Sequence, residues 1–236
     1  MTIRATVAIA ALVLQLGIAV AMVNKWEKPS SSEATISPTA RFDLQGHPSV
    51  GGEGAALTLV EFINYRCPYC EQAERDTFVG LRDKYVATGR ARWVVFDVPG
   101  DDDGMLAAEA ARCADAQGKY WEARKRLLAD VSAPVKEIVD AMPEEIGLAE
   151  WEFQQCLGRH QMWQAINADL ELVQRYRSQV SGAPTLFLGS ERAGKFEGLS
   201  AVVGNQSPDA YRSLIEVWLA HPPWGRSQPI AQGSGL

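Results

Sequence analysis

The chain of 236 residues carries 23 Lys and Arg against 29 Asp and Glu, which gives a formal net charge of −6 at pH 7. This balance argues against nucleic acid as a partner, because phosphate binding needs a basic patch. The nearest basic cluster, Arg124 to Arg126, is interpreted as one solvated helix face. An apolar content of 47% with 22% charged residues is ordinary for a globular protein and permits a sizeable core.

Residues 5–23 form an apolar run with a basic residue close to either end. Its nineteen residues suit a short membrane span or the core of a signal peptide, and Ala19-Val20-Ala21 offers a cleavage site. We therefore expect residues 1–23 to be a signal peptide or membrane anchor that exports the rest of the chain. Residues 24–50 are rich in Ser, Pro, Thr and Glu and lack apolar periodicity, which predicts a flexible tether.

The stretch from Leu57 to Cys70, LTLVEFINYRCPYC, joins a run of strand-forming residues to two cysteines in C-x-x-C spacing. Apolar residues then recur every three or four positions, which predicts a helix that begins at Cys67. There the sulfur faces unpaired N–H groups and the positive end of the helix dipole, and Arg66 adds a cation; each lowers a thiol pKa. Cys70, one turn on, is the expected resolving thiol. Pro68 suits the first turn, where its missing N–H costs nothing.

A C-x-x-C pair can also be half of a zinc site. The strand before it and the helix after it favour redox chemistry, and no second C-x-x-C or Cys/His pair follows. The scattered histidines argue against a Cys–His hydrolase. These histidines are His47, His160 and His221.

The chain after the first helix predicts an α/β domain interrupted by helices. Residues 92–96 form a second strand, which follows closely enough for parallel pairing with the first. Residues 101–180 show helical periodicity in almost every segment and are expected to be a helical insertion. Its large aromatic residues are expected in the core: Trp121, Trp151, Phe153 and Trp163.

Two short strands are expected after the insertion, at 186–188 and 195–197, with 189–192 as a hairpin connection. Ser207 and Pro208 then begin a helix as cap and first-turn residue. The expected division of the chain is signal peptide or anchor 1–23, tether 24–50, folded domain 51–100 and 181–222, helical insertion 101–180 and disordered tail 223–236.

The two remaining cysteines, Cys113 and Cys156, fall on predicted helices of the insertion, at a spacing that matches no metal motif. We expect a structural disulfide, because an exported protein tends to oxidise such a pair; two free buried thiols are the alternative. A closed loop of this size stabilises a fold by about 4 kcal/mol in the chain-entropy estimate.

VEFINYRCPYC resembles the active-site segment of DsbA-like thiol:disulfide oxidoreductases of the thioredoxin superfamily. A second motif, Gly182 to Thr185 before an apolar LFL, matches the loop in which that family carries a cis-proline facing the active site. The resemblance runs from about Gly46 to Ala220. It implies an α/β thioredoxin fold whose inserted helical domain caps the active site.

The resemblance also implies roles for single residues. Pro184 is the expected cis residue, and Ala183 is expected to face the substrate together with Pro68 and Tyr69. Glu61 aligns with a buried acid of the family and lies in a run that is apolar on both faces. We expect a raised pKa and a proton relay to Cys70, the alternative being a solvent-facing strand residue.

These features predict an exported enzyme that forms disulfides in reduced or unfolded exported proteins. The resemblance implies no cofactor, a membrane redox partner for recycling, and a location in the periplasm or at the extracytoplasmic face of the inner membrane. A stabilised Cys67 thiolate favours the reduced form, which makes an oxidant. Tyr69 stands where the strongest oxidants of this family carry His, which weakens any inference of extreme oxidising power. The alternatives are an isomerase or reductase kept reduced by a membrane partner, and a thiol-based metal-binding module.

Overall fold

The structure of the protein, a computed structural model, describes residues 40–222, with only the backbone at Leu199. The expected signal peptide or anchor, the first part of the tether and the expected tail lie outside these residues. Between residues 40 and 222, no helix is long and apolar enough to span a bilayer.

A mixed sheet forms the centre of this part, with strand order β1-β6-β5-β3-β4-β2. β3 pairs in parallel with β4, and the other neighbours are antiparallel. Every residue of β3 and β4 is buried, as expected for strands covered on both faces. The strands are β1 (Ala40–Asp43), β2 (Ser49–Val50), β3 (Leu57–Ile63), β4 (Ala91–Asp97), β5 (Thr185–Arg192) and β6 (Lys195–Val203).

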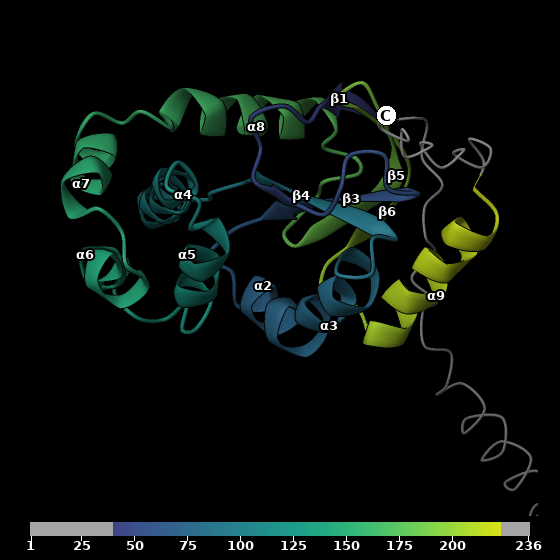
Figure 1. Ribbon diagram of the computed structural model, residues 1–236, viewed down its shortest axis with the longest axis horizontal. Coiled ribbons are helices and arrows are strands. Elements are labelled where there is room, and N and C mark those ends of the chain that lie inside the picture. The colour runs from purple at the N-terminus through teal and green to yellow at the C-terminus, as the bar shows by residue number, and fades with distance from the viewer. Residues whose placement is uncertain (1–39, 223–236) are drawn as a thin grey trace, which may run out of the picture. The chain divides into compact units, whose positions relative to one another are not determined.

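One long helical segment follows β3 and is called helix 68–86 below. It alternates α-helical and π-helical turns: α2 (Pro68–Ala73), η1 (Glu74–Phe78), α3 (Val79–Leu81) and η2 (Arg82–Val86). Figure 1 shows this segment on one face of the sheet beside α9 (Pro208–Ala220), while α8 (Trp163–Arg175) crosses the opposite face. Ser207 caps α9, since its side chain accepts a hydrogen bond from the Ala210 N–H at 3.2 Å.

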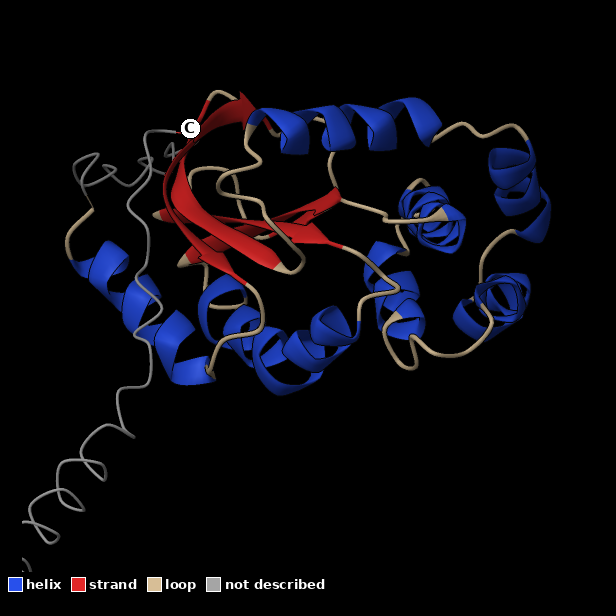
Figure 2. Ribbon diagram, turned by 180° about the vertical axis from the view of Figure 1, so that it is seen from behind, coloured by secondary structure: helices blue, strands red, loops and turns tan. Residues whose placement is uncertain are grey.

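The helical insertion lies between β4 and β5 in the sequence. Its helices α4 to α7 gather at one end of the sheet, and α8 leads the chain back to it, as the view from behind also shows (Figure 2). A disulfide joins Cys113 on α4 to Cys156 on α7, as expected. The first four helices are α4 (Asp102–Asp115), α5 (Tyr120–Leu127), α6 (Val135–Ile146) and α7 (Glu150–Gly158).

We expected residues 40–50 to belong to a flexible tether, but they supply both edge strands of the sheet. Ala40 and Phe42 are buried in β1 and alternate with exposed residues. Phe42 packs edge-on against Phe96 with ring centroids 5.3 Å apart. The hydroxyl of Tyr176, which follows α8, bonds to both backbone groups of Arg41: it accepts from the N–H at 3.0 Å and donates to the C=O at 2.9 Å.

Three further expectations were wrong. Residues 189–192 continue β5 with a register shift at Gly189, and the hairpin turn lies at Ala193 and Gly194. Among the aromatic residues expected in the core, Phe153 is fully buried, but Trp151 is 71% exposed and Trp163 is 42% exposed. Arg124, expected on a solvated helix face, is only 1% exposed.

Candidate active site

The C-x-x-C pair lies where β3 gives way to helix 68–86. Cys67 is the N-cap with extended backbone, and Pro68 is the first helical residue. The Cys67 carbonyl accepts from the N–H groups of Cys70 at 2.9 Å and Glu71 at 3.1 Å. Both cysteines are free thiols; Cys67 is half-buried and Cys70 is 1% exposed. The first sulfur can therefore meet another molecule, and the second is enclosed.

The two thiols differ strongly in acidity. A hydrogen bond from the Cys70 thiol lowers the pKa of Cys67 to about 6, against its own partial burial, and the N–H groups of Cys70 and Tyr69 add to this effect. Burial raises the pKa of Cys70 far above its usual value, and its hydrogen bond to Cys67 raises it further. Cys67 is thus the group that can become a thiolate near neutral pH.

A loop from the far side of the sequence faces Cys67. The Ala183–Pro184 peptide bond is cis, as the resemblance implied. In its protonated form Cys67 Sγ donates to the Ala183 carbonyl at 3.3 Å. Pro184 is buried, whereas Pro68 and Tyr69 are exposed beside the sulfur, Tyr69 by 65%. The structure therefore brings together the residues expected to contact a substrate.

Glu61 is buried in β3, and its carboxylate has partners that the sequence did not predict. It accepts from Arg124 Nη2 at 2.8 Å and from Trp93 Nε1 at 2.8 Å. Its charge is one of the influences that raise the pKa of Cys70, although burial is the largest. Glu61 is therefore buried, as expected, and is a paired carboxylate whose charge acts on Cys70.

Arg124 is the centre of a buried charge cluster that sequence reasoning missed. Arg124 Nη2 also donates to Glu74 Oε2 at 2.8 Å, and Glu74 pairs with Arg82. Although burial opposes it, the charge of Arg124 and the hydrogen bond from Arg82 lower the pKa of Glu74 to about 2. The available signal was that a buried Glu61 requires a cation, but α5 could not be placed beside β3 from sequence.

We expected the Arg66 cation to lie beside Cys67, but its guanidinium binds elsewhere. Its Nη1 donates to the Ala133 carbonyl at 2.9 Å, in the loop between α5 and α6. In that loop the hydrogen bonds from Ser132 lower the pKa of Asp130, and the charge of Arg66 adds to them. The guanidinium is directed at the helical insertion, which leaves the Cys70 thiol and the helix-terminal N–H groups to stabilise the Cys67 thiolate.

The residues just before Cys67 are also fixed from the insertion. Tyr65 is buried, and its hydroxyl shares a hydrogen bond of 2.7 Å with the hydroxyl of Tyr120 on α5. Asn64 accepts from the Cys67 N–H through its carbonyl at 3.1 Å and from the Arg66 N–H through its side chain at 2.9 Å. An aromatic hydroxyl next to a C-x-x-C motif was the available signal for Tyr65.

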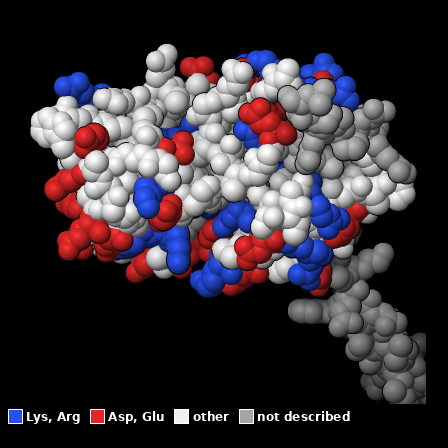
Figure 3. Space-filling view, in the orientation of Figure 1, with Lys and Arg blue, Asp and Glu red and all other residues white. Residues whose placement is uncertain are grey.

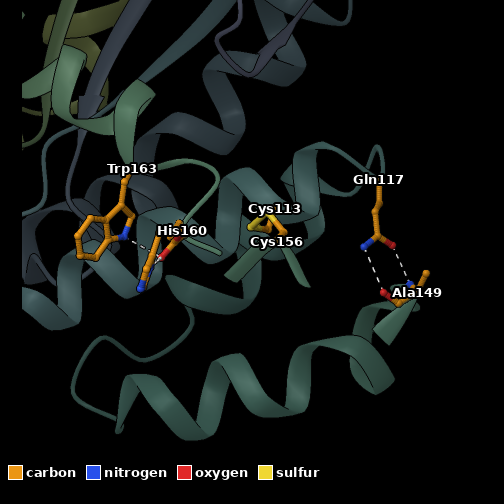
Figure 4. The surroundings of a disulfide bond; sticks show 7 residues. Cys113, Gln117, Ala149, Cys156, His160 and Trp163 are labelled. Carbon is orange, nitrogen blue, oxygen red and sulfur yellow. Dashed lines mark hydrogen bonds and ion pairs between the residues drawn. A yellow bond between two sulfur atoms is a disulfide. The ribbon is translucent and has the colours of Figure 1, made fainter. Parts of the chain in front are cut away.

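The disulfide between Cys113 and Cys156 lies apart from these groups, within the insertion (Figure 4). Gln117 binds the Ala149 backbone twice nearby, donating at 3.3 Å and accepting at 2.7 Å. These contacts hold α4 against α7. In the part of the chain that the structure describes, no group of three His, Cys, Asp or Glu side chains could hold a metal ion.

The fold, the C-x-x-C motif and the cis-proline loop together define a protein of the thioredoxin class. The sequence profile of the thioredoxin family matches residues 43–216, and the chain belongs to that family. Its likeness to DsbA proteins is visible in the crystal structure of Wolbachia pipientis alpha-DsbA1. That structure matches with a TM-score of 0.65 at 18% identity, over 75% of this chain and 92% of the other. At this identity the match shows the fold.

Two relatives extend the comparison. A protein-disulfide oxidoreductase of Rickettsia conorii is 22% identical over 152 residues, which are 62% of this chain and 54% of that protein. The Na(+)/H(+) antiporter NhaA 3 of Salinispora tropica is 31% identical over 179 residues, which are 73% of this chain. The chain spans about half the length of the first relative and 26% of the second.

Proposed function

We propose that the protein is a thiol:disulfide oxidoreductase that forms disulfides in reduced proteins through Cys67 and Cys70. The observation that carries this proposal is the asymmetry of the pair. Cys67 is accessible with a pKa lowered to about 6, while Cys70 is enclosed with a raised pKa. A low pKa makes Cys67 a good leaving group and stabilises the reduced enzyme, which favours oxidation of the substrate.

In the proposed reaction the enzyme begins with a Cys67–Cys70 disulfide. A substrate thiolate attacks Cys67 Sγ, a mixed disulfide forms, and Cys70 leaves with the electron pair of the broken bond. A second substrate thiolate then attacks the substrate sulfur of the mixed disulfide and releases Cys67 as a thiolate. The substrate loses two electrons and two protons; the enzyme pair gains the two electrons, Cys70 takes up one proton, and the other proton passes to solvent.

The departing Cys70 must gain a proton inside the protein, because burial disfavours its thiolate. Glu61 is the proposed proton relay of this step, since its charge acts on the Cys70 thiol and favours the protonated form. Pro68, Tyr69 and Ala183 are proposed to contact the substrate, and Pro184 to close the site beside Cys67.

We further infer that the protein acts outside the cytoplasm on exported proteins and is reoxidised by a membrane redox partner. The apolar run 5–23 supports export, and the Cys113–Cys156 disulfide suits an oxidising compartment. The named disulfide oxidoreductase among the relatives supports the reaction class.

The test is a pair of single variants. Cys67→Ser is expected to abolish oxidation of a reduced dithiol protein, because it removes the accessible sulfur. Cys70→Ser is expected to accumulate mixed disulfides through Cys67, measured by mass spectrometry without reduction. Equal trapping by both variants would contradict the assigned roles. A reduction potential near that of thioredoxin, about −270 mV, would point to a reductase.

A further inference from the structure

A groove of about 750 Å³ runs between helix 68–86 and α5, which lie side by side in Figure 1. One wall comes from helix 68–86, the other from α5 and the residues after it, and β2 closes the far end. The lining residues are Val50, Gly51, Glu71, Glu74, Arg75, Val79, Arg82, Asp83, Val86, Ala87, Trp121, Lys125, Leu128 and Ala129.

The first wall is continuous with Cys67. Its lining residues recur at the three- and four-residue steps of one helix face, from Glu71 to Ala87. Cys67 stands one turn before Glu71 on that face, and the Glu71 N–H donates to the Cys67 carbonyl at 3.1 Å. At 1.5 Å per residue, this wall is about 24 Å long, which matches about seven residues of extended chain.

The second wall also ends at the active site. Leu128 and Ala129 close α5 and lead into the loop of Asp130 to Pro134. Arg66, the residue before Cys67, binds this loop through the Ala133 carbonyl at 2.9 Å. A polypeptide whose cysteine reaches Cys67 therefore meets the open end of the groove on both walls.

The lining favours an apolar occupant of no particular charge. Val79 on one wall is 45% exposed, and Trp121 on the other wall is a partly buried aromatic residue. Three acidic and three basic residues line the groove, and Glu74 and Arg82 among them are paired with each other. Figure 3 shows the same mixing of charges along the side where helix 68–86 lies. Reduced polypeptides offer apolar segments in varied charge contexts.

The wall of helix 68–86 is locally widened as well. Glu74 and Arg75 lie in the π-helical turn η1, and Arg82, Asp83 and Val86 lie in η2. π-helical turns are rare and occur often at functional sites. Here both of them contribute side chains to the groove.

We propose that this groove binds an extended, apolar segment of the same reduced polypeptide whose cysteine reacts at Cys67. The inference rests on the proposed function and adds a second contact region, separate from the cis-proline loop. Binding there holds an unfolded substrate on the enzyme through consecutive side chains while its thiol is at the active site.

The test compares two exposed valines on helices. Val79→Glu places a charge in the groove, and Val217→Glu places the same charge on α9, where the side chain is 57% exposed and does not line the groove. Each full-length variant oxidises a short dithiol peptide and a long peptide with about eight added apolar residues on either side of the dithiol. Val79→Glu should lower kcat/KM for the long peptide about ten-fold and leave the short peptide unchanged. Val217→Glu should match the parent with both.

A cysteine-free version of the long peptide tests the groove without the reaction. Calorimetry should show binding to the parent and to Val217→Glu, and about ten-fold weaker binding to Val79→Glu. Equal binding by all three proteins, or equal losses with short and long peptides, would overturn the inference. Failure of the parent to oxidise either peptide, with the binding difference intact, would count against the proposed function and not against the groove.

Discussion

The two sulfurs of the active-site pair differ in what surrounds them. Cys67 takes a hydrogen bond from the Cys70 thiol and lies at backbone N–H groups of the helix terminus. Cys70 is enclosed and lies near the charge of Glu61. Only two residues, Pro68 and Tyr69, therefore separate a thiol with a lowered pKa from one with a raised pKa.

We predict that alkylation of Cys67 in the reduced protein follows a titration with a midpoint near pH 6. The rate should fall about ten-fold per pH unit below the midpoint and level off above it, because only the thiolate reacts. The depressed pKa also stabilises the reduced fold, fully above about pH 9 and less as the pH falls through about 6. The titration of Cys67 is measured from rates of iodoacetamide labelling, followed by mass spectrometry.

Cys70→Ala is the matched control, since it removes the donor that contributes most to the shift. Its midpoint should move upward toward that of an ordinary thiol. An unchanged midpoint in Cys70→Ala would show that the helix terminus alone is responsible for the acidity.

Arg124 is the residue on which the buried acids depend. Replacing it with Met leaves Glu61 and Glu74 without their shared cation, and we predict a loss of about 3–5 kcal/mol in the free energy of unfolding. Denaturant titration measures it. Arg126→Met on the same helix breaks an exposed pair with Glu145 and should cost less than about 1 kcal/mol. Similar losses in both variants would contradict the cluster's importance.

At the level of elements, the disulfide joins two helices whose cysteines are 43 positions apart with Cα atoms 5.8 Å apart. We predict that replacing Cys113 and Cys156 with Ala lowers the free energy of unfolding by up to about 4 kcal/mol, mainly by freeing the unfolded chain. Denaturation in a Cys67→Ser, Cys70→Ser background isolates this effect. The prediction fails if the unfolding midpoint does not move.

Elements with strong local signals could be predicted from the sequence. β3 is a strand of mostly apolar, strand-forming residues, and Pro68 marks the helix start, so the position of Cys67 at the beginning of the helix followed from local chemistry. The helices of the insertion followed from their periodicity. The contact between Ala183 and Cys67 could be predicted only from the family resemblance, because 116 positions separate the two residues.

Other features depended on partners distant in sequence. β1 and β2 are too short for their own pattern to identify them, and only pairing with β6 and β4 makes them strands. The polar residues of 189–192 read as a turn, yet β6 extends beside them as a partner. The direction of the Arg66 side chain could not be predicted from the sequence, because its acceptor Ala133 lies in a distant loop.

At the scale of the whole domain, the sheet depends on its first residues. β1 and β2 both come from residues 40–50, and they cover β6 and β4 at opposite edges. In the same segment His47 stacks on Phe96 at 3.7 Å between ring centroids and bonds Asp169 on α8 at 2.7 Å. This short stretch therefore contacts the sheet and the last helix of the insertion.

We predict that a chain shortened to begin at Gly51 loses at least about 3 kcal/mol of unfolding free energy relative to one that begins at Ala40. Removal of the buried Phe42 ring alone accounts for a loss of that order. Denaturant unfolding of the two shortened chains provides the comparison, with Phe42→Ala as an intermediate case. Equal midpoints would show that residues 40–50 are dispensable.

The Tyr176 hydroxyl at β1 affects whether copies of the protein can aggregate through the edges of their sheets. The outer edge of a sheet offers backbone donors and acceptors to any passing strand, which is a common route to aggregation. Here one hydroxyl occupies both the N–H and the C=O of Arg41, with its ring against Phe42 at 5.8 Å between centroids. A foreign strand would have to displace an anchored tyrosine before it could pair. The tyrosine thereby protects the β1 edge from pairing with unfolded chains, which are the proposed substrates of this protein.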